Sequence, residues 1–178
     1  MDTLPDYLAE GLDLVFVGIN PSMISVRLGH YYANPRNRFW RVFNACEMAN
    51  AHLNFETDDL ILAHKMGFTD LVKRPTVGIS ALTIYDFRRG VQELKRKLEY
   101  FRPRLICFQG LTAYRQYLRL IERTARNVCL GRQPELIGES IVFVVPNPSS
   151  ANAGFSLNTL IYWCSKLKDL RDELKQHI

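Results

Sequence analysis

Gly18-Ile19-Asn20-Pro21-Ser22 follows the apolar run Leu14–Val17, and Asn147-Pro148-Ser149-Ser150 follows a second apolar run, Ile141–Val145. Short apolar runs bounded by turn-forming residues are typical of strands that are buried on both faces. In an α/β sheet, ligands bind among the loops that follow the carboxyl ends of the strands. We therefore expect the two Asn-Pro loops to line one ligand site.

The rest of the chain alternates between helix and strand patterns. Apolar residues recur at near-helical spacing in 37–48, 86–101, 111–121 and 157–175, and a shorter helix is expected at 58–65. Leu105–Phe108 is a further continuous apolar run, which predicts another buried strand. Strands that alternate with amphipathic helices predict an α/β fold, a three-layer α/β/α sandwich around a mainly parallel sheet. The length of 178 residues predicts a single domain over residues 1–178.

The composition is that of an ordinary globular protein. Hydrophobic residues make up 47% and charged residues 23%, which argues against disordered and fibrous classes. We see no apolar run of about 18 residues and no secretion signal at the N-terminus, so we expect a cytoplasmic protein without a membrane partner. The four cysteines form no C-x-x-C pair, which predicts buried reduced thiols and no metal site; they are Cys46, Cys107, Cys129 and Cys164.

Positive charge is concentrated around the first Asn-Pro loop. The formal net charge is +5, and no acidic residue occurs between Leu14 and Cys46. The same stretch contains Arg27, Arg36, Arg38 and Arg41. This distribution predicts a positive field that suits a polyanionic partner, although a solvated basic face gives the same pattern.

Further short motifs accompany the two Asn-Pro loops in a fixed order. They are Gly29–Tyr32, Asn37–Trp40, Thr69–Val72, Arg74–Thr76, and Gly110 with Ala113-Tyr114. With this set the sequence resembles the mismatch-specific uracil-DNA glycosylase and thymine-DNA glycosylase branch of the uracil-DNA glycosylase superfamily, over nearly the whole chain. The resemblance implies a uracil-DNA glycosylase-like fold and hydrolysis of the bond between a base and deoxyribose, without metal or redox cofactor. It also implies double-stranded DNA with G:U or related mismatches as the partner, and we expect a monomer.

The resemblance assigns the hydrolysis to Asn20, which is expected to position the attacking water. An amide is a poor base, but it can hold a water by hydrogen bonds, and an oxocarbenium-like sugar needs little activation of its nucleophile. The leaving base carries negative charge, so backbone N–H groups of the loop would stabilise it. The expected base pocket therefore includes Gly18, Ile19, Pro21 and Ser22. The alternative is that Asn20-Pro21 only forms a turn.

Two residues of the following loop complete the expected base pocket. The resemblance places Tyr32 where an aromatic ring stacks on the extruded pyrimidine, which is typically worth about 1–3 kcal/mol per base. His30 is a candidate for hydrogen bonding to the base, although a lone histidine is more often structural. Tyr31 is expected to be a half-buried loop aromatic.

The second Asn-Pro loop is expected to enter the minor groove of DNA. The resemblance assigns DNA contacts to Asn147, Pro148, Ser149, Ser150, Ala151 and Asn152, with hydroxyl and N–H groups binding phosphates. Ala151 is too small to fill the space of an extruded base, which leaves Asn152 to contact the unpaired partner. Alternatively this tract is only a capping loop, with Ser156 as the N-cap of the last helix.

Asp70 is a candidate second catalytic residue. It stands where some relatives have Lys, and a carboxylate facing the site could activate water or stabilise the cationic sugar. Two structural alternatives remain open: a cap of the segment after Thr69, or a surface ion pair with Lys73 or Arg74.

The sequence thus predicts a monofunctional DNA glycosylase that extrudes uracil, or thymine or a modified pyrimidine, from mismatched DNA and so initiates base excision repair. One alternative is a glycosylase of the same superfamily that acts on deaminated purines such as hypoxanthine or xanthine. Another is a DNA-binding protein that recognises lesions without catalysis.

Overall fold

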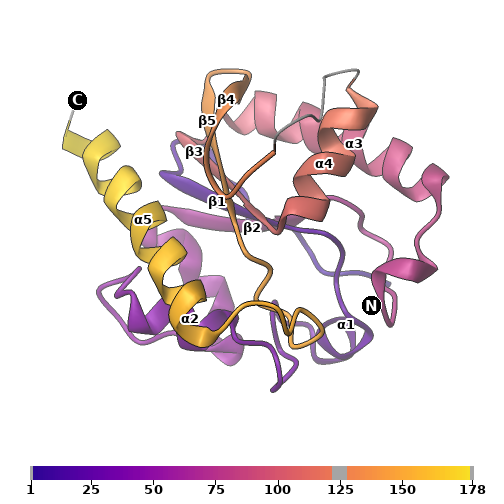
Figure 1. Cartoon of the computed structure of the whole chain (residues 1–178), viewed down its shortest axis with the longest axis horizontal. Coiled ribbons are helices and arrows are strands. Elements are labelled where there is room, and N and C mark those ends of the chain that lie inside the picture. The colour runs from indigo at the N-terminus through magenta and orange to yellow at the C-terminus, as the bar shows by residue number, and fades with distance from the viewer. Residues whose placement is uncertain (1, 122–127, 177–178) are drawn as a thin grey trace.

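The computed structural model describes residues 2–121 and 128–176. Within these residues, one five-stranded sheet has the strand order β2-β1-β3-β5-β4 (Figure 1). Its strands are β1 (Leu14–Gly18), β2 (Met66–Asp70), β3 (Leu105–Gln109), β4 (Gly131–Ile137) and β5 (Ser140–Val145). All neighbouring strands pair in parallel except β4, which is antiparallel to β5.

Helices cover both faces of the sheet, as the alternation of side chains along β1 shows. Phe16 packs in a core with α2 (Phe39–Ala45) and α5 (Leu157–Gln176), whereas Val15 and Val17 pack in a second core with α3 (Ile84–Phe101) and α4 (Leu111–Leu120). The short helices α1 (Met23–Leu28), η1 (Phe55–His64) and η2 (Ile79–Ala81) lie in the connections. The predicted α/β sandwich with a mainly parallel sheet is confirmed.

The strands with continuous apolar runs were predicted, and the two other strands were not. β2 contains a glycine and a polar pair, Thr69-Asp70, although all five of its residues are buried. β4 is an edge strand in which exposed and buried residues alternate, and it contains Pro134. The short helix expected at 58–65 is observed as η1, which begins three residues earlier and ends at His64; Gly67 lies in β2 and pairs with Val15.

Two smaller expectations also need correction. Cys129 is exposed, whereas the other three cysteines are buried and free as predicted. Tyr31 is only 3% exposed, not half-buried, because it packs on Phe68 at a ring distance of 5.0 Å. None of the helices in the described ranges is long and apolar enough to cross a membrane.

Candidate active site

Both Asn-Pro loops leave the same edge of the sheet. Strands β1 and β5 both run parallel to β3, which lies between them, so their carboxyl ends meet at one edge. The first loop continues into α1 and the second leads towards α5, and both lie at the lower end of the molecule in Figure 1. The expectation that the two loops border one site is consistent with this topology.

The first loop is fixed by a ladder of backbone hydrogen bonds to the segment after β2. Leu71 N donates to Gly18 O at 2.8 Å, and Val72 N donates to Ile19 O at 2.8 Å. Further on, Ser22 forms a parallel bridge with Thr76. The backbone of residues 19–22, which follow β1, is therefore supported by the segment after β2 nearly as in a sheet.

The Asn20 side chain has a defined orientation. Its Nδ2 donates to Arg74 O at 3.0 Å and to Thr76 Oγ1 at 2.7 Å. The Thr76 hydroxyl donates its single proton to Gly78 O at 2.9 Å, so it must accept from Asn20. The amide cannot be reversed, because Arg74 O accepts but cannot donate. Asn20 Oδ1 consequently points away from the 74–78 segment, and it accepts no hydrogen bond from the residues that the structure describes.

Asp70 lies beneath the start of the first loop. It is the last residue of β2, pairs in register with Gly18, and is 6% exposed. A Cβ atom on Gly18 would collide with Asp70 Oδ1 and would lie 3.9 Å from the Tyr32 hydroxyl. Gly18 thus provides the space that the carboxyl group occupies. Asp70 Oδ2 is enclosed and has no hydrogen-bond partner among the described residues.

Burial raises the pKa of Asp70 to about 7, because a charged carboxylate loses its hydration there. The Lys73 ammonium, 4.0 Å from Oδ2, lowers this pKa, and the Asp6 carboxylate raises it. The proposed surface pair with Arg74 is absent, since Arg74 binds Asp86 at 2.8 Å. The contact with Lys73 exists, but Asp70 is buried, and no cap formed by Asp70 is seen in the described residues.

Tyr32 extends from the α1–α2 connection towards Gly18. Its backbone has φ 54°, a left-handed conformation that is rare outside glycine. Its ring stacks on Phe39 with a centroid distance of 3.9 Å and an interplanar angle of 10°, so one face of the ring is covered. Burial and the nearby Asp70 raise the pKa of Tyr32 well above its usual value, which keeps the phenol neutral.

The structure places His30 in a different set of contacts. Its Nδ1 lies 2.9 Å from Asp58 Oδ1, and its ring lies beside Phe55. Asp58 is fully buried, and it also accepts from Tyr31 N at 2.6 Å and from Tyr7 Oη at 3.3 Å. His30 therefore ties the loop before Tyr32 to η1, and its role in base binding stays a prediction.

The second loop is held by one side chain, that of Arg38. Its guanidinium donates to four backbone carbonyl oxygens, those of Pro148 (3.2 Å), Ser149 (3.2 Å), Asn152 (3.0 Å) and Phe155 (2.7 Å). The Arg38 backbone N–H also donates to Pro148 O at 3.1 Å. Since Arg38 is occupied in this way, it is not one of the free charges of the basic stretch; Arg27, Arg36 and Arg41 are exposed.

The second loop is also closed by its own hydrogen bonds. Asn147 Oδ1 accepts from Ser149 N at 2.8 Å, and Asn152 Nδ2 donates to Asn147 O at 3.0 Å. Two of the groups expected to meet DNA are thus bound within the loop, while Ser150 and Ala151 are exposed. The predicted capping by Ser156 is confirmed, because its Oγ accepts from Thr159 N at 3.1 Å.

Two important residues were missed in the sequence. Arg38 occupies the N-cap position of α2, where arginine is a poor cap and forms no capping bond. That mismatch is a signal that its side chain is used elsewhere. Thr76, which is 6% exposed and fixes Asn20, gave no comparable signal, because its partner lies 56 residues away.

Other features of this edge do not add a metal or ligand site. A narrow, mostly apolar cavity is lined by Phe39, Gln109, Pro146 and Pro148, among others, but not by Asn20, Asp70 or Tyr32. No group of three or more His, Cys, Asp or Glu side chains suited to a metal ion occurs in the described residues.

The family model of the uracil DNA glycosylase superfamily matches residues 5–171. The chain belongs to this superfamily. It is also similar to the solution NMR structure of a "putative Uracil DNA glycosylase from Methanosarcina acetivorans", with 25% identity, a TM-score of 0.57, and coverage of 97% of each chain.

Membership in the uracil DNA glycosylase superfamily implies a DNA glycosylase, a hydrolase that acts on DNA in repair. The matched region contains every residue that sequence analysis assigned to the site.

Proposed function

We propose that this chain is a monofunctional glycosylase of the mismatch-specific type, which hydrolyses the N-glycosidic bond of uracil in mismatched double-stranded DNA. The single observation that carries the proposal is the fixed orientation of the Asn20 amide. Both of its protons are donated to the 74–76 segment, so its carbonyl oxygen remains available at the carboxyl edge of the sheet. That arrangement suits a residue that accepts a hydrogen bond from a water molecule and so holds the water oxygen in place.

In this proposal, a water donates one hydrogen bond to Asn20 Oδ1 and keeps a lone pair directed at the anomeric carbon. The glycosidic bond breaks first, because the sugar can carry positive charge as an oxocarbenium-like species. The base leaves as an anion, which backbone N–H groups of residues 19–22 stabilise; Pro21 cannot contribute one. Water then adds to the sugar and an abasic site remains.

Asp70 is the second catalytic group of the proposal. A carboxyl group with a pKa near 7 is partly ionised at neutral pH, and its enclosed Oδ2 has a free acceptor position among the described residues. The anionic form would stabilise the cationic sugar and take the proton that the attacking water loses. Tyr32 would present the ring face opposite Phe39 to the base, and that stacking would not select among bases.

The second loop would bind the DNA strand around the extruded nucleotide. Its exposed tip, Ser150 and Ala151, carries no large wedge, and Asn152 is bound within the loop in the free protein. A weakly paired base costs least to extrude, so this loop suits mismatched or damaged pairs better than intact ones. The exposed Arg27, Arg36 and Arg41 supply positive charge for the phosphates.

The decisive experiment is incubation of the full chain with labelled duplexes that contain G:U, A:U, G:T or hypoxanthine, followed by alkaline cleavage of abasic sites. We expect the fastest cleavage for G:U. Hypoxanthine as the best substrate would contradict the assignment to uracil. Binding of these duplexes without any strand cleavage would contradict catalysis altogether.

A further inference from the structure

We propose that Lys73 is a positioning residue that sets the ionisation of Asp70, and that Asp6 and Tyr31 hold its ammonium group close to the carboxyl group without a hydrogen bond to it. The inference depends on the proposed function only where activity is measured. The electrostatic part concerns the free protein and stands by itself.

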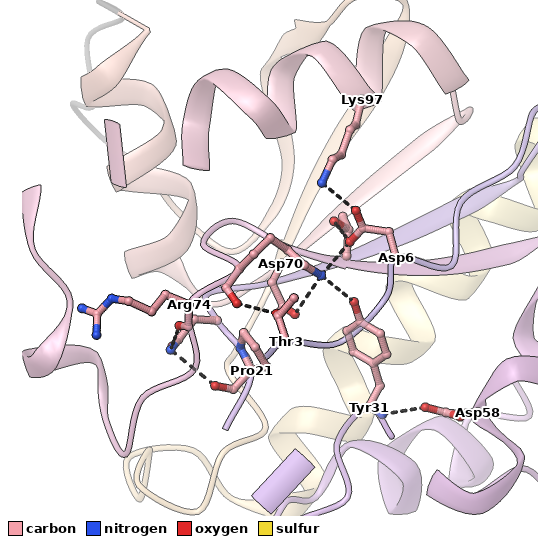
Figure 2. A network of polar contacts seen from close by, with 11 residues as sticks. Thr3, Asp6, Pro21, Tyr31, Asp58, Asp70, Arg74 and Lys97 are labelled. Carbon is pink, nitrogen blue, oxygen red and sulfur yellow. Dashed lines mark hydrogen bonds and ion pairs between the residues drawn. The ribbon is translucent and has the colours of Figure 1, made fainter. Parts of the chain in front are cut away.

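The contacts of the Lys73 ammonium show how it is held. Nζ donates to Asp6 Oδ1 at 2.7 Å and to the Tyr31 hydroxyl at 3.3 Å, but it remains 4.0 Å from Asp70 Oδ2 (Figure 2). The last distance is within ion-pair range and too long for a hydrogen bond. The ammonium therefore provides a countercharge to Asp70 but leaves the acceptor position of Oδ2 open.

Asp6 cannot move freely towards another partner, because three groups bind its carboxylate. Thr69 Oγ1 donates to Oδ1 at 2.8 Å, and Lys97 Nζ from α3 lies 2.6 Å from Oδ2. Lys73 Nζ completes the set. Figure 2 shows Asp6 between Lys97 on one side and Asp70 and Tyr31 on the other. The cluster joins the N-terminal segment, β2 and α3 into one fixed unit.

The groups that face Asp70 act on it with opposite signs. Lys73, which follows β2, and Lys97 on α3 favour the ionised carboxylate, whereas Asp6 favours the protonated acid. The Tyr31 hydroxyl accepts from Lys73 and can turn its own proton towards the Asp70 carboxylate, which also lowers the pKa of Asp70. Tyr32, on the same connection as Tyr31, lies close to the carboxyl group but is neutral, since its own pKa is raised well above the usual value.

This arrangement has a functional consequence. A direct hydrogen bond from Lys73 to Oδ2 would lower the pKa of Asp70 and so weaken its carboxylate as a base. Removal of the ammonium would leave the buried carboxyl protonated across the neutral range. An ammonium held at 4.0 Å by Asp6 and Tyr31 avoids both outcomes. Asp70 can then be ionised and still have an unoccupied oxygen.

The test is an NMR titration of the Asp70 side-chain carboxyl carbon in the full chain, with the resonance assigned by its absence in Asp70→Asn. We expect Lys73→Met to raise the Asp70 pKa by about 1 unit or more, and Asp6→Asn to lower it. Lys73→Arg should restore most of the wild-type value. Lys95→Met, which removes a half-exposed ammonium on α3 that faces Glu99, is the matched control and should have no effect.

Shifts in one direction for both Lys73→Met and Asp6→Asn, or no shift in either, would overturn the inference. If Lys73→Met does not fold, Lys73→Gln retains a donor for Tyr31 and is expected to shift the Asp70 pKa in the same upward direction.

The pH dependence of single-turnover uracil release separates the inference about Lys73 from the proposed function. If the acid limb of the pH–rate profile moves with the Asp70 pKa measured by NMR, the proposed function and the inference about Lys73 both stand. If the NMR shifts occur but the acid limb of the profile stays in place, the inference about Lys73 stands and Asp70 is not the catalytic base.

Discussion

The two Asn-Pro loops leave the same sheet edge, but they are supported in different ways. The first, residues 18–22, is paired along its backbone with the segment after β2, and its Asn20 side chain is fixed by two further bonds. The second, residues 147–152, is held mainly by the guanidinium of Arg38 and by turns within itself. In the proposed function, the distributed support of the first loop suits a side chain that holds a water in place, and the support of the second loop, mainly from Arg38, suits a loop that adapts to DNA.

The largest expected effect comes from Asn20→Ala in the first loop. Loss of the amide oxygen should reduce the single-turnover rate of uracil release by about 10²–10³-fold, the range seen when one fixed polar group in an active site is removed. Binding of abasic product DNA should stay within about twofold, because the backbone ladder of the loop does not involve the side chain. The matched control is Asn158→Ala, at an exposed position at the start of α5.

Arg38→Ala should destabilise the conformation of the second loop and leave that of the first loop unchanged. The carbonyl oxygens of Ser149, Asn152 and Phe155 lose their donor, while that of Pro148 keeps the Arg38 backbone N–H. We therefore expect the Kd for duplex DNA to rise about 10–100-fold, at a cost of about 1–3 kcal/mol in folding stability. Arg38→Lys should not rescue binding, because one ammonium cannot span the four carbonyl oxygens. Arg41→Ala, an exposed arginine on α2, is the control for lost charge. Equal weakening by both alanine variants would show that Arg38 acts only through its charge.

Gly18→Ala tests the fit between the first loop and the carboxyl group below it. The new methyl group would collide with Asp70 Oδ1, and overpacking of this kind typically costs about 1–3 kcal/mol. In an Asp70→Ala background, the same substitution should cost less than about 1 kcal/mol. Gly78→Ala is the control, because a Cβ there meets no atom within 4 Å. Additive effects of the substitutions at 18 and 70, measured by urea unfolding, would contradict the predicted collision.

Asp70→Asn should change how stability depends on pH. The folded protein has a pKa near 7 at this position and the unfolded chain one near 3.8, so the folded state binds the proton more tightly. Folding stability should therefore fall as the pH rises from about 4 to about 7, and this contribution should be constant above that range. Asp70→Asn should lack this decline and be more stable than wild type at pH 8, by up to about 4 kcal/mol at about 1.4 kcal/mol per pKa unit. Urea unfolding at several pH values measures this, and identical slopes in both proteins would refute it.

The sequence predicted those parts of the fold that depend on local pattern. Leu14–Val17 and Ile141–Val145 are continuous apolar runs and form strands, and the amphipathic α3 begins only two residues before its expected start. β2 was not assigned as a strand because glycine and polar residues interrupt its apolar pattern, and they are buried by its position between β1 and Tyr7 of the N-terminal segment. β4 has the alternating pattern of an edge strand and lacks an apolar run.

The site was predictable to a smaller extent. The position of Asn20 after a buried strand was accessible from the sequence, but the bonds that orient its amide come from residues more than 50 positions away. The contacts of Arg38 span more than 100 residues, and no local pattern specifies them. The pairing of His30 with Asp58 is likewise a tertiary contact. Such contacts depend on the assembled fold, which the spacing of residues along the chain does not encode directly.

The most direct test of the account is a structure of the protein bound to a G:U duplex in which a 2′-fluorine on the uracil nucleotide slows hydrolysis. We predict an extruded uracil between the two Asn-Pro loops, with a water about 3 Å from Asn20 Oδ1 on the side of the sugar opposite the base. An Asn20 side chain that contacts only protein atoms, with the water held by other groups, would contradict the account.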